Sequence, residues 1–247
     1  MRTPNRRLEQ WLLGYPDRAL ASIRDAVHLA ERLGHPLSLD IAYLYEAVIH
    51  LFRREPDIAL QRAHAAEVLA AEQRLALNLE PNILRGGALL AQGAIDRAVA
   101  SMQEGIAAAA VWQLYRPYHL ALYAEALGRV GDYDGALTAL ADALDGIERN
   151  GERWWEAEIH RLKGVSLRSQ ERFAESEASL EQSIRIARRQ QAKSLELRGA
   201  TSLAQLWSDQ GKRDQARHLL APIYAWFAEG FDTSDLKDAR MLLDELA

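Results

Sequence analysis

An acidic stretch with one histidine is the part of this sequence that comes nearest to a metal site. Glu156, Glu158 and His160 alternate along the chain, and carboxylate and imidazole groups are both common metal ligands. The seven histidines, however, form no His-x-x-x-His pair and no other recognisable ligand spacing. We therefore interpret the stretch as exposed helix charges beside one packed histidine, and we expect no metal ion.

Other motifs that carry catalytic or cofactor chemistry are incomplete or missing. Asp132-Tyr133-Asp134-Gly135 resembles the start of a calcium loop but lacks the later ligands, including the glutamate at the twelfth position. Gly211-Lys212 lacks the lead residues and the trailing hydroxyl of a phosphate-binding loop. No Gly-x-Ser-x-Gly turn is present, and the chain has no cysteine. We therefore predict that the protein is not an enzyme and binds no cofactor.

Composition and charge narrow the class of protein further. The chain has 247 residues, of which 49% are hydrophobic, and a formal net charge of -5. A general nucleic-acid binder is normally basic, so we expect no nucleic-acid partner. No apolar run approaches the roughly 18 residues that a membrane span needs, so we expect no membrane partner. The lack of cysteine fits a reducing compartment, and we predict a cytoplasmic protein.

Six copies of one hexapeptide organise the elements that would position any site. The copies begin at Gly14, Arg54, Gly93, Gly131, Glu171 and Gly211, each 38 to 40 residues after the one before. The first residue is glycine in four copies, which suits the left-handed end of a helix. An aspartate in five copies favours the start of the next helix. The last residue is always alanine or serine, which allows two helices to pack closely.

The repeat predicts an all-α fold: a right-handed α-α superhelix, or solenoid, of about six long helix pairs with a C-terminal capping helix. No long linker divides the chain, so we expect residues 1–247 to form one solenoid. The predicted units are about 1–36, 37–76, 77–114, 115–150, 151–190 and 191–230, with the capping helix at about 234–246. The first unit has room for only a short first helix, which indicates a fragment of a longer protein or a free-standing remnant of one. The C-terminus, in contrast, is expected to be complete.

The most regular copy carries a family resemblance. Gly131-Asp-Tyr-Asp-Gly-Ala136, with Ala124 before it and Leu140 and Ala143 after it, resembles the tetratricopeptide repeat. The usual repeat there is about 34 residues, so the units of this chain are longer. Residues 151–158, 188–198 and 220–233 resemble the C-terminal repeat region of bacterial signalling proteins that combine a class III nucleotide cyclase domain with an ATPase. The catalytic parts of that family are not in this sequence, so its activity is not carried over.

The resemblance implies that the first helix of each pair lines the concave side of the superhelix. At the equivalent positions, units four to six carry mostly polar residues, and we predict a groove there that holds a ligand. Its expected residues are Tyr118, Glu125, Arg129, Glu158, Arg161, Arg168, Arg198, Gln205 and Asp209. Arginine pairs carboxylates in two-point fashion, so the expected partner is a protein or peptide, and an acidic peptide would suit the arginines. The alternative is that these arginines pair with Glu125, Glu158 and Asp209 on neighbouring helices.

The same face of unit two is apolar. Leu44, Val48, Leu51 and Phe52 would form a large exposed patch there, which usually marks an interface. A partner domain or a first helix could cover the patch. We therefore predict that self-association through the N-terminal end is possible.

Together these patterns predict a non-catalytic scaffold for protein–protein interaction or ligand sensing, the repeat arm of a bacterial signalling protein. The alternative is a regulatory module of a nucleotide cyclase or ATPase whose catalytic domains lie outside this chain. An enzyme with a site inside the superhelix has the least support, because no paired catalytic residues can be named.

Overall fold

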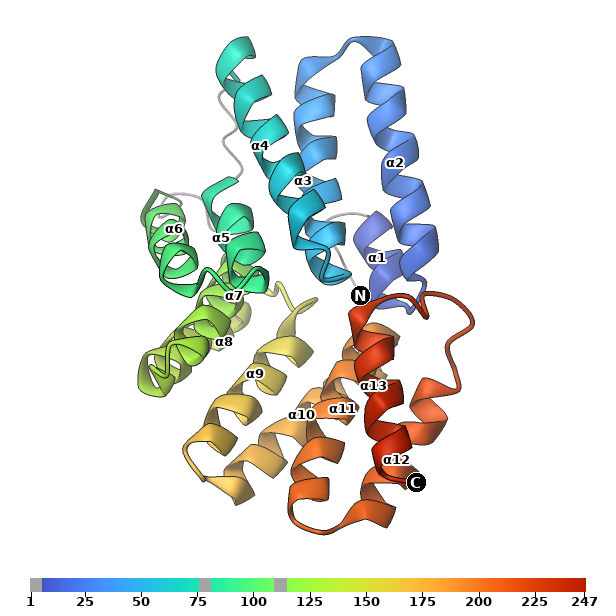
Figure 1. The fold of residues 1–247 in the computed structure, drawn as a ribbon. Coiled ribbons are helices and arrows are strands. Elements are labelled where there is room, and N and C mark those ends of the chain that lie inside the picture. The colour runs from blue at the N-terminus through green and yellow to red at the C-terminus, as the bar shows by residue number, and fades with distance from the viewer. Residues whose placement is uncertain (1–5, 76–80, 109–114) are drawn as a thin grey trace.

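The computed structural model describes residues 6–75, 81–108 and 115–247, and these residues form thirteen α-helices and no strand. Parts of the predicted first, second and third units, in 1–5, 76–80 and 109–114, lie outside the described residues. The helices are α1 (Arg6–Leu12), α2 (Pro16–Leu33), α3 (Pro36–Phe52), α4 (Pro56–Gln73), α5 (Pro81–Ala91), α6 (Ile95–Ala108), α7 (Arg116–Arg129), α8 (Tyr133–Asn150), α9 (Glu156–Ser169), α10 (Phe173–Gln190), α11 (Lys193–Asp209), α12 (Arg213–Tyr224) and α13 (Ser234–Glu245). Six antiparallel pairs, α1–α2 to α11–α12, are followed by α13, which packs on α11 and α12. The predicted all-helical solenoid is confirmed (Figure 1).

The turns inside the pairs follow the hexapeptide. Its first residue is left-handed in all six copies, with φ between 77° and 94° at the four glycines. Arg54 and Glu171 adopt φ of 58° and 60° at the same position, although a side chain is strained there. The turn geometry is therefore imposed by helix packing even where glycine is missing.

Small residues form the seam inside each pair, as the repeat predicts. Ala19, Ala59, Ala98, Ala136, Ser176 and Ala216, the last residues of the six hexapeptides, are fully buried. At Gly164 a methyl group would lie 2.6 Å from Leu180, so glycine is required for the close approach of α9 and α10. Ser176 takes part in the same contact, because its hydroxyl donates a hydrogen bond to the Gly164 carbonyl at 2.7 Å.

The solenoid curls until its two ends meet, and Figure 1 shows the N-terminal helices beside the last ones. We call the contacts between α1–α3 and the region from α11 to α13 the clasp. In it, Arg53 pairs with Asp232 at 3.0 Å, and Arg54 pairs with Asp238 at 2.6 Å. The Ser194 hydroxyl donates to the Trp11 carbonyl at 2.5 Å. The sequence predicted a groove along units four to six but gave no sign that the two ends of the solenoid would meet.

Aromatic side chains fill the centre where the ends meet. The rings of Trp11, Phe52, Tyr118, Trp154 and Trp155 are all buried. Phe52 stacks on Trp155 with ring centroids 4.8 Å apart, and Trp11 lies 6.2 Å from Trp155. Residues of the first, second, fourth and fifth units therefore share one core, which fixes the curvature of the ring.

Candidate binding cavity

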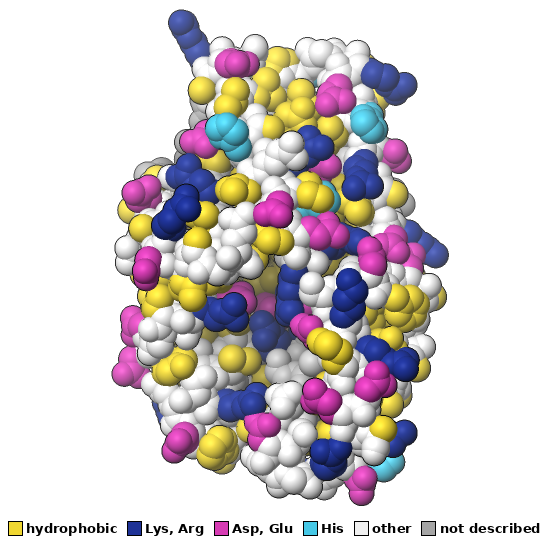
Figure 2. Space-filling model, in the orientation of Figure 1, with side chains coloured by type: hydrophobic (Ala, Val, Ile, Leu, Met, Phe, Trp, Pro, Cys, Tyr) yellow, Lys and Arg dark blue, Asp and Glu magenta, His cyan; other side chains and the backbone are white. Residues whose placement is uncertain are grey.

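The concave side of the ring encloses a cavity of about 820 Å³. Figure 2 shows a hollow near the middle of this face, with basic and acidic side chains around it. Its walls come from the C-terminal end of α3 and from α5, α7, α9, α11 and α13. On α9 the lining residues Glu158, Arg161, Leu162 and Val165 recur at helical spacing, so one face of the helix points inward. A cavity of this size suits a drug-sized ligand or a short stretch of polypeptide.

Glu158 carries a buried negative charge in the cavity wall, with 4% of its side chain exposed. Arg161 donates two hydrogen bonds to its carboxylate, at 2.8 and 2.9 Å, and Arg198 approaches at 3.3 Å. Burial alone would raise the pKa of Glu158, but the two guanidinium groups hold that pKa at about 2. The carboxylate is therefore ionised at neutral pH and fully paired within the protein.

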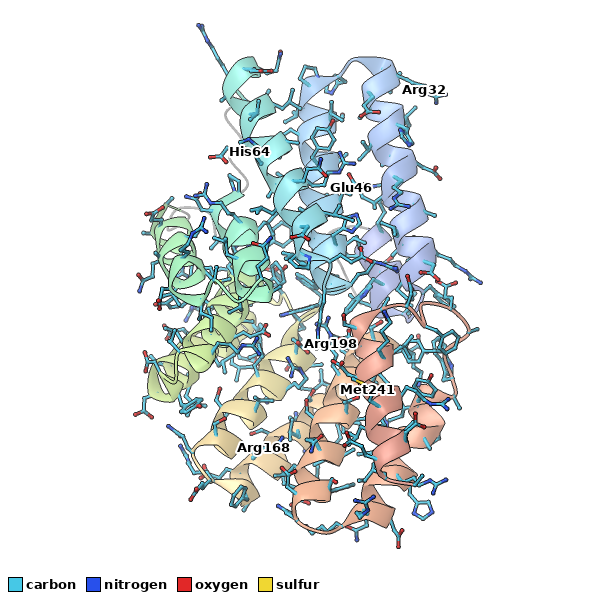
Figure 3. All side chains as sticks on the ribbon, in the orientation of Figure 1. Arg32, Glu46, His64, Arg168, Arg198 and Met241 are labelled. Carbon is cyan, nitrogen blue, oxygen red and sulfur yellow. The ribbon has the colours of Figure 1, made fainter. Side chains whose placement is uncertain are left out.

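Arg198 joins five helices at the edge of the cavity (Figure 3). From α11 it contacts Asp235 of α13 at 2.7 Å and Glu158 of α9. It also donates to the Phe52 carbonyl of α3 at 2.9 Å, and its guanidinium lies 4.8 Å from the Trp11 ring of α1. Because its guanidinium group already contacts these four partners, Arg198 links the helices of the ring and is not free to bind an anion.

Two charged residues of the cavity have no ion pair with any described residue. Glu125 and Arg129 lie four positions apart on α7, so they share one helix face. Two buried polar atoms are also without a hydrogen-bond partner, the Tyr118 hydroxyl and the Trp155 indole N–H. Both of these side chains are 3% exposed and line the cavity. Those two atoms have almost no accessible surface, so Glu125 and Arg129 are the groups left open to a ligand.

The structure brings together six of the nine predicted groove residues: Tyr118, Glu125, Arg129, Glu158, Arg161 and Arg198. The other three, Arg168, Gln205 and Asp209, form a separate group outside the cavity lining. Arg168 pairs with Asp209, and the Gln205 amide donates to Asp209 at 3.1 Å. Figure 3 shows Arg168 on α9, away from Arg198. For Arg161, Arg168 and Arg198, the alternative of pairing within the protein is the one observed, and whether any of the nine binds a ligand stays a prediction.

The predicted apolar patch of unit two is not exposed. Leu44, Val48 and Phe52 are buried, and Leu51 is partly buried. They pack in one cluster with Leu8 and Trp11 from α1 and with aromatic rings from α7 and the start of α9. The sequence suggested that a first helix could cover this patch, and the short α1 contributes to doing so. The exposed patch is therefore a wrong prediction, and self-association loses the observation on which it was based.

Several residues of the cavity were missed from the sequence. Trp155, Arg54 and Asp238 line it together with the predicted residues. Trp154 and Trp155 are both buried. Arg54 and Asp238 are 184 positions apart and meet only because the ring closes. No periodic signal in the sequence pairs them.

The acidic stretch of α9 binds its own neighbours. Arg153 donates to Glu156 at 3.0 Å, and Glu158 is paired as described. Burial, followed by the charges of Lys163 and Arg185, lowers the pKa of His160 to about 4. Within residues 6–75, 81–108 and 115–247, no group of three or more His, Asp or Glu side chains is placed to hold a metal ion.

In the same part of the chain, no helix is both long and apolar enough to cross a membrane.

Comparison with known proteins supports the repeat type. The tetratricopeptide repeat family model matches residues 115–189, the fourth and fifth units. A Rap protein complexed with Competence and Sporulation Factor has a TM-score of 0.68 at 16% identity, covering 98% of this chain and 66% of that chain. Cut9 of the APC/C hetero-tetramer Cut9–Hcn1 has a TM-score of 0.61 at 16% identity, covering 94% and 39%. BtubC from P. vanneervenii has a TM-score of 0.58 at 16% identity, covering 93% and 92%.

These matches define the class of the protein as an α-solenoid, and the tetratricopeptide repeat model matches its fourth and fifth units. No curated protein matches the sequence. The chain spans less than two thirds of the Rap and Cut9 chains, and identities of 16% show the fold alone. The tetratricopeptide part of the resemblance is thus supported, and the cyclase–ATPase part has no support from these comparisons.

Proposed function

We propose that the protein is a non-catalytic scaffold that binds a polypeptide partner in its central cavity. The observation that carries the proposal is a cavity of about 820 Å³ on the concave side of a tetratricopeptide-type solenoid, with Glu125 and Arg129 free of ion pairs to described residues. Two solved structures of similar fold are complexes: Rap with Competence and Sporulation Factor, and Cut9 with Hcn1. They support binding as the general role of such a solenoid.

The cellular setting is a finer part of the proposal. A role as the repeat arm of a bacterial signalling protein is supported only by the resemblance of residues 151–158, 188–198 and 220–233. The alternative, a regulatory module of a nucleotide cyclase or ATPase, predicts an upstream open reading frame that encodes a phosphate-binding loop. A cytoplasmic location is also part of the proposal and rests on the composition alone.

A cavity-filling variant tests the proposed function. A methyl group at Gly128 would meet only the Ser166 hydroxyl, at 4.0 Å, so a larger side chain there would extend into the cavity without displacing the backbone. The intact chain is used to capture proteins from a lysate of the source cells, and these are identified by mass spectrometry. Gly128→Phe should lose the specific partner, whereas Ala141→Phe, at an exposed position of α8, should keep it. A partner captured equally by both variants would place binding elsewhere.

A further inference from the structure

The charges of the cavity are almost balanced by pairs inside the protein. Glu158 is held by Arg161 and Arg198, and Arg198 is also held by Asp235. Arg54 pairs with Asp235 and Asp238 across the clasp. Glu125 and Arg129 therefore remain as one negative and one positive group that face the cavity without an ion pair to a described residue, and the Glu125 charge lies close enough to act on Arg161 and Arg198. The sequence predicted a polar groove in which the arginines hold an acidic partner, whereas most of these arginines are paired within the protein.

Two buried donors near these charges have no hydrogen-bond partner among the described residues, the Tyr118 hydroxyl and the Trp155 indole N–H. Each of these atoms has less than 1 Å² of accessible surface, so neither is open to a ligand in the cavity. Recognition of a ligand therefore falls to the charged groups and to the apolar wall.

The remaining walls and the closed shape limit the size of the ligand. Leu51, Leu90, Leu122 and Leu162 supply apolar surface around the polar groups. Ion pairs of the clasp form part of the rim, because Arg54, Arg198 and Asp238 line the same cavity. A folded domain does not fit a cavity of about 820 Å³ inside such a ring, whereas a few residues of extended chain do.

We propose that the cavity binds a short extended peptide segment that carries both an acidic and a basic side chain. Arg129 pairs with the acidic side chain, and Glu125 pairs with the basic one. This inference rests on the proposed function and specifies the chemistry of its partner.

Four pools of blocked hexapeptides test the charge class. Every pool is randomised over Ala, Leu, Gly and Ser. One pool also contains acidic residues, one contains basic residues, one contains both, and one contains neither. Retention on the intact protein is measured by affinity selection and mass spectrometry, with Gly128→Phe as the blocked reference. The mixed pool should be retained about tenfold above the other three, the ratio expected from one additional charge-assisted hydrogen bond.

Single variants then separate the two charges. Glu125→Gln should shift the preference to the acidic pool, and Arg129→Gln should shift it to the basic pool.

Three outcomes overturn the inference. The wild-type protein retains no pool above the Gly128→Phe reference, it prefers the acidic pool, or the preferences are the same in Glu125→Gln and Arg129→Gln. If a lysate partner is nevertheless captured in a Gly128-dependent way, the proposed function stands and only the mixed-charge peptide is excluded. If no partner depends on Gly128, the proposed function fails as well.

Discussion

Glu158 shows how a single residue keeps its charge inside this protein. Its carboxylate is nearly inaccessible to water, yet Arg161 and Arg198 surround it with donors. Removing one partner of such a buried pair leaves the other charge uncompensated, which is more damaging than losing a surface pair. The charge is therefore a condition for the stability of the ring.

Glu158→Gln should lower the free energy of unfolding at pH 7 by about 3 kcal/mol. The pKa of Glu158 is about 2 in the folded protein and 4.5 normally, so its stabilising effect is complete above pH 4.5 and is lost as the pH falls toward 2. The loss of stability between pH 4.5 and 2 should therefore be shallower in the variant than in the wild type. Urea unfolding at pH 7, 4 and 3 measures both effects. Glu181→Gln, which breaks an exposed pair with Arg185, should change neither.

Asp40 presents the opposite case. It lies on α3, 1% exposed, with one carboxylate oxygen unpartnered, and burial raises its pKa from 3.8 to about 6. The folded protein thus favours the neutral acid, and stability is lost as the pH rises from about 4 through 6. Asp40→Asn should raise the free energy of unfolding at pH 8 by about 2 kcal/mol and change it little at pH 4. Chemical unfolding at the two pH values tests this, with the exposed Asp142→Asn as control. An equal effect at both pH values would contradict the argument.

At the scale of the helix, α2 receives its N-terminal cap from the other end of the chain. Tyr15 at the cap position provides no side-chain hydrogen bond. Instead, one oxygen of Glu229 accepts from the backbone N–H groups of Asp17 and Arg18 at 3.0 and 3.1 Å. A negative charge at this position is favourable because it faces the positive end of the helix. The clasp therefore completes an element that the local sequence leaves unfinished.

Glu229→Ala should destabilise the protein by about 1 kcal/mol, the typical effect of losing a cap. In this variant the Asp17 and Arg18 amides lose their acceptor, so their hydrogen exchange should be faster than in the wild type. Asp132→Ala, which removes the local cap of α8 on Gly135, should cost a similar amount and leave those two amides protected. If their exchange is the same in Glu229→Ala as in the wild type, the cap from the distant end does not operate in solution.

The helices and their pairing could be predicted from the sequence because the hexapeptide acts locally. Gly131, Ala136 and Leu140 specify a turn, a close contact and a filled seam within one pair. The partner of Arg53 could not be predicted in this way, since Asp232 is 179 residues distant. Whether the two meet depends on a small rotation added at every repeat, and no single repeat encodes that sum. The same argument explains why Asp238, which lines the cavity beside Glu125, was missed.

At the scale of the whole molecule, closure changes how stability is distributed. In an open array each repeat contacts only its neighbours, and stability is close to a sum over repeats. Here the first helix contacts α11, and Trp11 shares a core with Trp155. Contacts between distant units tie the repeats together, so we expect the described units to unfold together.

The double variant Arg53→Ala, Arg54→Ala should weaken the clasp by roughly 3 kcal/mol, because Arg53 is buried and loses three partners. We expect a larger radius of gyration in small-angle X-ray scattering and a broader or two-step urea transition. Arg185→Ala, Arg240→Ala removes two exposed pairs that stay within one helix each and serves as the control. A double variant as compact and cooperative as the wild type would show that the aromatic core alone closes the ring.

Closure also bears on how such a chain can change in length over evolution. An open array tolerates duplication of one hairpin, because the new unit only displaces its neighbours along the axis. In this protein an inserted hairpin after residue 150 would carry Arg198 away from Phe52 and Trp11 away from Trp155. Duplications and deletions of whole hairpins should therefore be selected against, and divergence in this lineage should proceed by substitution inside a fixed number of units.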